Sequence, residues 1–251
     1  MFGRMGMMGQ GSRAGIEFPL TIEGCVLFLD ASDNSTVLNA SGDPCSDLEN
    51  VATWVDKSGQ GNDVVQATVN KQPIYYFDSP DFNGAPAIVF DDVINSTQLV
   101  NTTGAIQTSG NTEIYGFSNG EAGGANGYLI SGGISNGHLF LENGTPGAGN
   151  INLAMYAGAV VNSISVTANY AHVNTLIYDG ASSYHRYDQA ITGPANPGTG
   201  TSTGISIGAL YTGAGPSDCE FGIVLVYNRV LTTAEIESLE NWIYDNNKIG
   251  A

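Results

Sequence analysis

The chain has 251 residues, with 7 Lys and Arg against 24 Asp and Glu, which gives a formal net charge of −17 at pH 7. A body this acidic repels both a phosphate backbone and an anionic membrane surface, so we expect no nucleic-acid partner and no membrane partner. No run approaches about 18 consecutive apolar residues, which excludes a predicted transmembrane helix. Charged residues make up only 12% of the chain, and Gly, Ser, Thr and Asn take their place, as is typical of turn-rich β proteins.

Residues 1–19 form a Gly- and Met-rich segment that we predict to be an extended arm. Glycine recurs too often there for a stable helix, and methionine is flexible and polarizable, which suits irregular grooves on a partner. The segment lacks the apolar stretch of about 7–15 residues that a secretory signal peptide needs, so we expect no cleaved leader. The alternative interpretation is a disordered tail. The residues predicted to contact a partner are Met1, Phe2, Arg4, Met5, Met7, Met8 and Arg13.

Residues 20–251 are predicted to form a single all-β domain, because short apolar segments are separated by stretches rich in Gly, Pro and Asn. Several of these segments alternate apolar and polar residues, as half-buried antiparallel strands do. The predicted strands are Glu23–Asp30, Pro73–Phe77, Ala87–Phe90, Glu113–Phe117, Tyr128–Ser131, His138–Glu142, Asn152–Tyr156, Ser163–Val166, Thr175–Tyr178, Ser183–Tyr187, Ser206–Ala209 and Phe221–Asn228.

Two polar turns follow early apolar segments. The run Val26–Leu29 leads into the turn Asp30–Asp33, and Trp54 leads into a second turn that ends at Asn62. Carboxylate and amide oxygens at turns are the hard ligands that calcium prefers, although Asp and Asn at turns also bond their own backbone. No cofactor is required by the sequence, and calcium is the one ion that it suggests. The candidate calcium ligands are Asp30, Asp33, Asp56 and Asn62.

Short motifs spread over residues 20–250 share a pattern with one known family. They are Leu29–Asp33, Trp54–Asn62, Gln72–Tyr75, Asn83–Asp91, Tyr178–Gly180, Ile205–Ala209 and Phe221–Leu231. Together they resemble the laminin-G-like, concanavalin-A-like jelly rolls that are common in bacterial surface proteins and phage virions. The resemblance implies an antiparallel jelly-roll β-sandwich with a short C-terminal helix, and relatives in that family often carry a structural or ligand-bridging calcium.

The C-terminal region alone has helical periodicity. Thr232 is the predicted N-cap of this helix, and Glu235 is placed to bond back to it as a capping box. The predicted buried face carries Ile236, Leu239, Trp242 and Ile243. The acidic residues Glu235, Glu237 and Glu240 are predicted to form the solvated face of the helix.

The 3 cysteines contain no Cys-x-x-Cys metal pair. Cys25 and Cys45 form a bridge only if the loop between them folds back, which leaves Cys219 over. The odd count therefore favours free, mostly buried cysteines over a disulfide framework.

Residues with catalytic potential do not form a known constellation. Gly133–Gly137 matches the letters of a nucleophile elbow, but a predicted strand follows where that motif needs a helix. His138, His172 and His185 lack the spacing of metal ligands and are predicted to be surface or partly packed residues. Jelly-roll hydrolases of the laminarinase type carry two carboxylates on one strand in the pattern Glu-x-Asp-x-x-Glu, which this chain lacks. We therefore expect no enzymatic activity.

Carbohydrate binding is the commonest activity that the resemblance implies. Such a site needs exposed aromatic rings beside polar side chains, on a concave face or a loop rim. Trp54 and Trp242 are predicted to be core residues instead. The candidate tyrosines are Tyr115, Tyr128, Tyr156, Tyr170, Tyr184, Tyr187 and Tyr211.

Two functions fit these observations. The first is a phage virion structural protein, either a capsid decoration or a tail or fibre component, that lies at the particle surface. Its arm would grip other virion proteins, such as capsid or tail subunits, and so raise the local concentration of the domain at its docking site. The alternative is a lectin-like adhesin, extracellular or at a cell surface, that binds host cell-surface glycans. A homo-oligomer is compatible with either.

Overall fold

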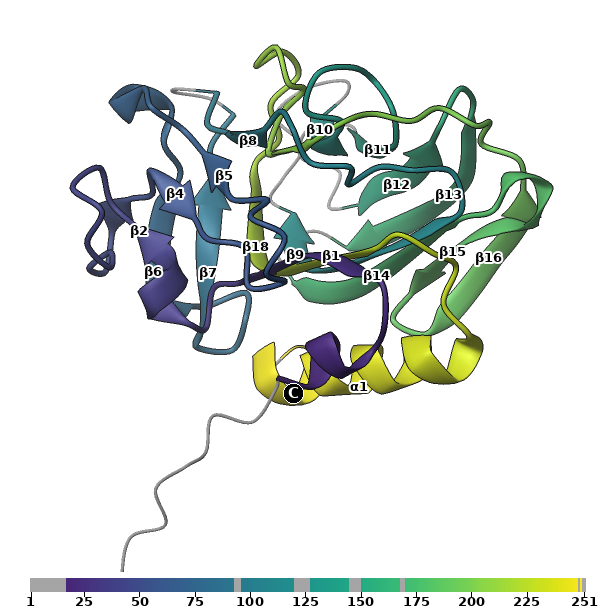
Figure 1. Ribbon diagram of the computed structural model, residues 1–251, viewed down its shortest axis with the longest axis horizontal. Coiled ribbons are helices and arrows are strands. Elements are labelled where there is room, and N and C mark those ends of the chain that lie inside the picture. Colours follow the sequence, from purple (N-terminus) through teal and green to yellow (C-terminus); the bar gives the residue numbers. More distant parts are fainter. Residues whose placement is uncertain are drawn as a thin grey trace, which may run out of the picture.

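The computed structural model describes residues 17–92, 96–119, 127–144, 150–167, 170–247 and 249. Two antiparallel sheets pack face to face as a β-sandwich, and one α-helix lies against the outer face of the first sheet (Figure 1). The predicted all-β sandwich with a C-terminal helix is therefore confirmed. Within the described residues, no helix is long and apolar enough to cross a membrane. The predicted arm contacts all lie outside the described residues.

The first sheet is built around two long central strands, β9 and β18. Its order is β16-β15-β14-β9-β18-β7-β6-β3, and β1 also pairs with β18. All of these pairs are antiparallel. The strands are β1 (Cys25–Asp30), β3 (Glu49–Asn50), β6 (Ile74–Ser79), β7 (Ala85–Phe90), β9 (Asn111–Asn119), β14 (Ala171–Tyr178), β15 (Ser183–Tyr187), β16 (Ala190–Ala195) and β18 (Cys219–Tyr227).

The second sheet has its long strands at one side and short strands at the other. Its order is β13-β12-β11-β10-β17-β8-β5-β4-β2. The strands are β2 (Val37–Leu38), β4 (Thr53–Trp54), β5 (Val64–Val65), β8 (Leu99–Asn101), β10 (Gly127–Ser131), β11 (Leu139–Gly144), β12 (Asn150–Tyr156), β13 (Val160–Thr167) and β17 (Ile205–Ile207). Short 3-10 turns occur at η1 (Phe18–Thr21), η2 (Asn34–Thr36), η3 (Val69–Lys71) and η4 (Gly180–Ser182).

Each predicted strand overlaps a strand of the structure, with small shifts at the ends. The strands that the sequence did not reveal are β2, β3, β4, β5, β8 and β16. All but β16 are only two or three residues long, too short to show an alternating pattern. β16 is an edge strand that contains Pro194, a residue that argues against a strand in sequence but is tolerated at an edge.

Aromatic rings from both sheets fill the space between them. Phe117 of β9 contacts Phe140 of β11 edge to face at 5.1 Å and stacks on Phe221 of β18 at 5.6 Å. Trp54 is fully buried in the same core cluster, as predicted. Because each aromatic ring removes a large apolar surface from water, these residues are expected to dominate the stability of the sandwich.

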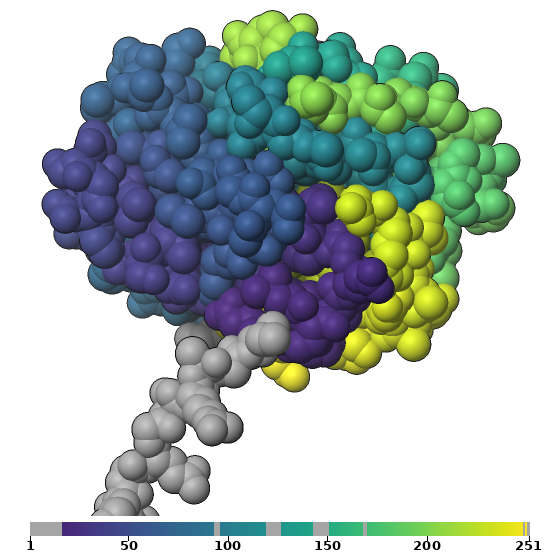
Figure 2. Space-filling model, viewed as in Figure 1, coloured from purple at the N-terminus to yellow at the C-terminus, as the bar shows by residue number. Residues whose placement is uncertain are grey.

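The helix α1 (Thr233–Asn247) covers a second, smaller core on the outer face of the first sheet. Ile236, Leu239 and Ile243 are fully buried there, as predicted. Trp242 is only partly buried and packs edge to face on Phe28 at 6.1 Å. The first described residues (purple in Figure 2) lie beside the helix (yellow). Phe18 of this segment packs with its ring centroid 6.4 Å from that of Trp242.

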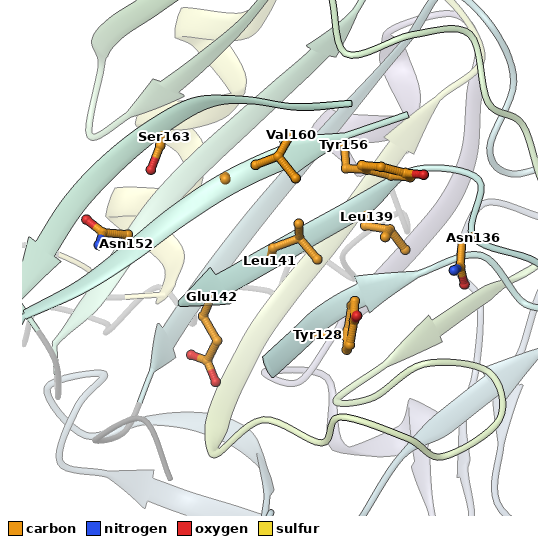
Figure 3. A pocket seen from close by; sticks show the side chains of 10 residues that line it. Tyr128, Asn136, Leu139, Leu141, Glu142, Asn152, Tyr156, Val160 and Ser163 are labelled. Atoms are coloured by element: carbon orange, nitrogen blue, oxygen red, sulfur yellow. The ribbon is translucent and has the colours of Figure 1, made fainter. Parts of the chain in front are cut away.

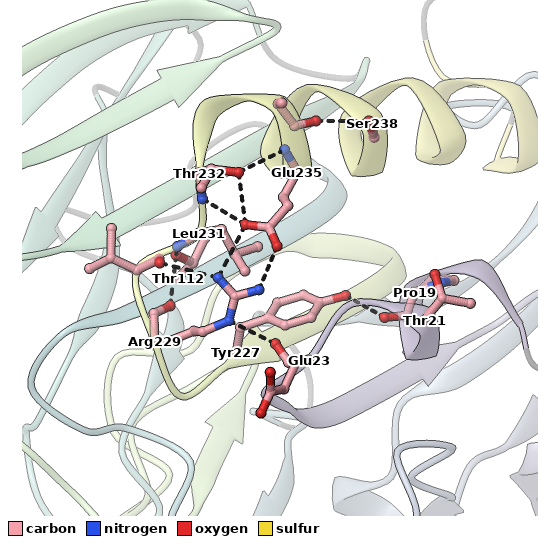
Figure 4. A network of polar contacts seen from close by, with 12 residues as sticks. Pro19, Thr21, Glu23, Thr112, Tyr227, Arg229, Leu231, Thr232, Glu235 and Ser238 are labelled. Carbon is pink, nitrogen blue, oxygen red and sulfur yellow. Dashed lines mark hydrogen bonds and ion pairs between the residues drawn. The ribbon is translucent and has the colours of Figure 1, made fainter.

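The start of α1 is fixed by the predicted capping box. The backbone N–H of Thr232 donates to Glu235 at 2.8 Å, and the N–H of Glu235 donates to the Thr232 hydroxyl at 3.3 Å. The Arg229 guanidinium donates two hydrogen bonds to the same carboxylate, one to each oxygen, and a third to the carbonyl of Glu23 (Figure 4). The hydrogen bonds from the Arg229 guanidinium above all, and from the Thr232 backbone, lower the pKa of Glu235 to about 2. The network ties the N-terminal segment to the helix.

Two predictions about polar side chains are wrong. Glu240 is not on the solvated face of α1 but fully buried, because it falls one turn from Ile236 and pairs with Arg186. His138 and His185 are buried as well, because each ring has a polar partner inside the fold. The Glu113 carboxylate bonds His138, and the Asn174 amide oxygen lies 2.8 Å from His185.

The three cysteines are free, with Cys45 and Cys219 buried and Cys25 partly buried, as the odd count predicted. The segment that matches a nucleophile elbow leads directly into strand β11 and not into a helix.

Candidate functional site

A depression lies on the outer face of the second sheet. It has a volume of about 580 Å³, within the range of ligand pockets. Strands β10, β11, β12 and β13 supply nearly all of its lining (Figure 3). The lining residues are Tyr128, Asn136, Leu139, Leu141, Glu142, Asn152, Ala154, Tyr156, Val160 and Ser163. We call this depression the sheet pocket.

Strand alternation explains why these side chains face outward. Phe140 and Met155 pair across β11 and β12 and point into the core, so their chain neighbours point to the opposite face. Leu139 and Leu141 therefore form the floor of the sheet pocket. Leu139 is only 4% exposed although it lies on an outer face, which fits a floor that its neighbours shield.

Two half-buried tyrosines stand on either side of this floor. Tyr128 of β10 pairs with Leu141, and Tyr156 of β12 pairs with Leu139. The two tyrosines are therefore separated by two strand spacings, about 9–10 Å across the sheet, and they are also offset by two residues along β11. Figure 3 shows both rings at the rim with the leucines between them. The result is an apolar surface framed by two phenol groups.

The polar groups of the sheet pocket are available to a ligand. Within the described residues, neither the hydroxyl groups of Tyr128 and Tyr156 nor the side chains of Asn136, Asn152 and Ser163 make a hydrogen bond to the protein. Amide and hydroxyl groups of this kind both donate and accept. They can therefore exchange bound water for the hydroxyl groups of a ligand.

Glu142 is the one charged residue among these lining residues, and its side chain has a different setting. It pairs with Leu153, a core residue, so its carboxylate lies on the inner side of β11 and is 3% exposed. A side chain on the neighbouring Gly127 would collide with this carboxylate and with the Ser217 hydroxyl. Glycine at that position therefore lets the carboxylate lie between β10 and β11 at the end of the sheet pocket.

Two of the predicted calcium residues, Asp30 and Asp33, come together at a different place, around Lys57. The Lys57 ammonium lies 2.9 Å from Asp33, 3.4 Å from Asp30 and 2.8 Å from Glu17. A bound cation at this position would compete with that ammonium group. Within the described residues, no group of three or more His, Cys, Asp or Glu is arranged to hold a metal ion. Calcium stays a prediction here.

The other two predicted calcium residues build the loop itself. Asp56 accepts hydrogen bonds from the backbone N–H groups of Phe28, Ser58 and Asn62 at 2.8–3.0 Å. The Asn62 amide donates to the carbonyl of Val26 at 2.7 Å. These bonds join the second turn motif to strand β1, which gives the sequence motif a structural role.

The structure sorts the candidate tyrosines. Tyr128 and Tyr156 line the sheet pocket, whereas Tyr115 is fully buried in the core. Tyr170 is 62% exposed but lies away from the sheet pocket. Sequence reasoning missed Asn136, Asn152 and Ser163, although the alternation in β12 places Asn152, Ala154 and Tyr156 on one face. The remaining candidates outside the sheet pocket are Tyr184, Tyr187 and Tyr211.

An acidic cluster at the start of β18 has unusual protonation. Burial above all, together with the nearby carboxylates of Asp81 and Asp218, raises the pKa of Glu220 to about 7, although the hydrogen bond from Ser79 acts to lower it. Burial and the charges of neighbouring aspartates likewise raise the pKa of Asp218 to about 6. Both groups therefore bind protons more tightly in the folded protein than in the unfolded chain.

This protonation predicts a loss of stability as the pH rises. Between the ordinary value of 4.5 and about 7, the folded state holds a proton on Glu220 that the unfolded chain has released, so raising the pH favours unfolding. The free energy of unfolding should fall less between pH 5 and pH 8 in Glu220→Gln than in the unmodified protein. We expect a difference of about 1–2 kcal/mol, after allowance for the partial exposure of Glu220. Urea unfolding at pH 5 and pH 8 measures it, with the exposed Glu237→Gln as control. An equal pH slope in Glu220→Gln and the unmodified protein would contradict the assignment.

Comparison with known proteins shows the fold of this chain. No protein-family model matches the sequence, and no curated protein matches it. An arabinofuranosidase in complex with arabinofuranosyl-α-1,2-xylobiose has a TM-score of 0.60 at 14% identity, over 91% of this chain and 60% of that one. Domain 4 of an arabinanase from Geobacillus stearothermophilus, in complex with arabinotriose, has a TM-score of 0.54 at 10% identity, over 86% and 98%.

A third similar structure is Trypanosoma rangeli sialidase, with a TM-score of 0.55 at 13% identity. The match covers 89% of this chain and 33% of the sialidase, so this chain spans a third of that protein's length. It spans 60% of the arabinofuranosidase. At these identities the likeness shows a shared β-sandwich fold, and the laminin-G type stays a prediction.

Proposed function

We propose that this protein is a carbohydrate-binding module and that the sheet pocket holds the sugar. The observation that carries this proposal is the pair Tyr128 and Tyr156 on either side of a leucine floor. The C–H faces of a sugar ring pack well on apolar and aromatic surfaces, while its hydroxyl groups need neutral donors and acceptors at the rim. Asn136, Asn152 and Ser163 supply such groups.

The similar structures support this proposal by analogy. Two of them are named as complexes with arabinose-containing oligosaccharides. Fold alone does not determine function, so the sheet pocket itself is the main support for this proposal. Within this proposal the protein binds a glycan without transforming it.

Replacing either pocket tyrosine is expected to lower glycan affinity at least about tenfold, because each ring supplies a large part of the contact area. The measurement begins with an oligosaccharide array that includes arabinotriose and arabinofuranosyl-xylobiose. Calorimetry on the best ligand then compares Tyr128→Ala and Tyr156→Ala with the unmodified protein. Tyr170→Ala is the matched control, since Tyr170 is exposed outside the sheet pocket.

The outcomes of this experiment are distinct. Affinity lost in both pocket variants and kept in Tyr170→Ala supports the proposal. Equal affinity in all variants places the glycan elsewhere, and no binding by the unmodified protein rejects the proposal. Deletion of residues 1–15 is expected to leave glycan affinity unchanged, because the sheet pocket is built entirely from later strands.

The virion role stays a prediction from the sequence. This prediction depends on the Gly- and Met-rich arm. The contact residues predicted in that arm lie outside the described part of the chain. It is compatible with carbohydrate binding, since a protein displayed on a particle can also touch host glycans. Particles that lack this protein test it: under this proposal they bind the full-length chain but not the chain without residues 1–15.

A further inference from the structure

The sheet pocket lies in a long stretch of sequence without positive charge. No Lys or Arg occurs between Lys71 and Arg186, and every lining residue falls within 128–163. The connections at 120–126 and 145–149 lie in the same stretch, so they also contain no Lys or Arg. Neither the strands of the sheet pocket nor the connections between them can offer a guanidinium or ammonium group to a ligand.

The cations that flank this stretch in space have other partners. Arg186 makes two hydrogen bonds with Glu240, at 2.9 and 2.8 Å, on the far side of the first sheet beneath α1. Lys57 and Arg229 are also paired with carboxylates. Arg186, Lys57 and Arg229 are therefore committed to the structure, and the exposed Lys71 lies outside the lining of the sheet pocket.

The sheet pocket offers no positive charge to a ligand. Glu142 is the charged member of the described lining, and it belongs to a chain with a net charge of −17. An anion that enters a pocket loses its hydration shell and needs a cation or several N–H groups in return. Here it meets neutral amides and hydroxyls and no cation, which costs affinity.

We propose that the sheet pocket selects uncharged sugar residues and rejects residues that carry a carboxylate or sulfate group. This inference rests on the proposed carbohydrate-binding function. It narrows the ligand class to neutral pentoses and hexoses. The apolar floor and the neutral rim groups recognise the ring and its hydroxyls, and the lack of a cation excludes the acidic members.

The test compares matched ligands that differ in one acidic group. Neutral xylo-oligosaccharides and the same chains with one glucuronic acid residue are titrated into the full-length protein. We expect at least about tenfold tighter binding of the neutral chain at low salt. At 1 M salt the Debye length falls to about 3 Å, so remote charges are screened while a preference set inside the sheet pocket persists.

A gain-of-function variant separates the local cause from the overall charge. Ser163 is exposed at the sheet pocket, and Ser163→Lys places an ammonium group there. We expect Ser163→Lys to reduce the ratio of the affinity for the neutral chain to the affinity for the acidic chain by at least about threefold. Ser41→Lys changes the net charge equally at an exposed site between β2 and β3, outside the sheet pocket, and is expected to keep the preference. The ratio of affinities is compared, so partial blocking of the sheet pocket does not affect the result.

Each outcome decides the question. A neutral preference that persists at high salt and narrows only in Ser163→Lys supports the inference. Equal or tighter binding of the acidic chain overturns the inference and leaves the proposed function intact. If the unmodified protein binds no member of a broad oligosaccharide array, the proposed function fails and the inference fails with it.

Discussion

Replacing Glu240 with alanine is expected to lower the free energy of unfolding by about 3–5 kcal/mol. The carboxylate of Glu240 accepts two hydrogen bonds from Arg186 and one from the Thr175 hydroxyl, at 2.8–2.9 Å. The side chains of Arg186 and Glu240 are 4% and 1% exposed. Removal of the carboxylate leaves the guanidinium buried without its counter-charge. The cost therefore comes mainly from the unpaired partner and exceeds the net contribution of the intact pair.

The chain offers a matched control on the same helix. Glu237 lies 4.0 Å from the same guanidinium but is 55% exposed, so Glu237→Ala is expected to cost about 0–1 kcal/mol. The double variant Arg186→Met/Glu240→Leu is expected to recover most of the loss, because two apolar side chains replace both charges. Urea unfolding measures the midpoint and its slope for all three. A loss in Glu240→Ala no larger than that in Glu237→Ala would show that the pair is not desolvated.

Glu240 also shows what helical periodicity can and cannot predict. The spacing of Ile236 and Ile243 gave the buried face correctly. Glu240 lies four residues after Ile236 and three before Ile243, so it falls on the same face. Its burial depends on Arg186, which is 54 residues away and on another element. A pairing of that kind is set by tertiary structure and leaves no local signal in the sequence.

The strands and the sheet pocket differ in the same way. Long strands such as β14 and β18 carry enough apolar residues to be predicted, whereas β4 and β5 are too short. Tyr128 and Tyr156 were both named as candidates, but their meeting requires the order β10-β11-β12. Sheet order is fixed by long-range pairing, and single-sequence patterns do not contain it. The sequence therefore supplied the residue types of the site and not their arrangement.

Glu113 holds a buried polar network together between the two sheets. Its side chain is 1% exposed and accepts hydrogen bonds from the Tyr115 hydroxyl, from the Asn111 amide at 3.1 Å and from His138, whose ring nitrogen lies at 2.8 Å. The His138 ring stacks on Tyr178 with 3.7 Å between centroids. Glu113 belongs to the first sheet, and His138 immediately precedes β11 of the second. The network thus links β9 to the strand that supplies the floor of the sheet pocket.

We expect Glu113→Ala to lower the free energy of unfolding by about 3–5 kcal/mol, because several buried donors lose their common acceptor at once. Tyr115→Phe removes one donor and is expected to cost about 1 kcal/mol, so the double variant should show strong coupling between the two sites. Urea unfolding measures the cycle. Because His138 adjoins Leu139, we also expect faster amide exchange along β11 in Glu113→Ala than in Glu237→Ala. Two results together would show that Glu113 does not hold the floor of the sheet pocket in place. They are additive losses of unfolding free energy in the double variant and an unchanged rate of amide hydrogen exchange in β11.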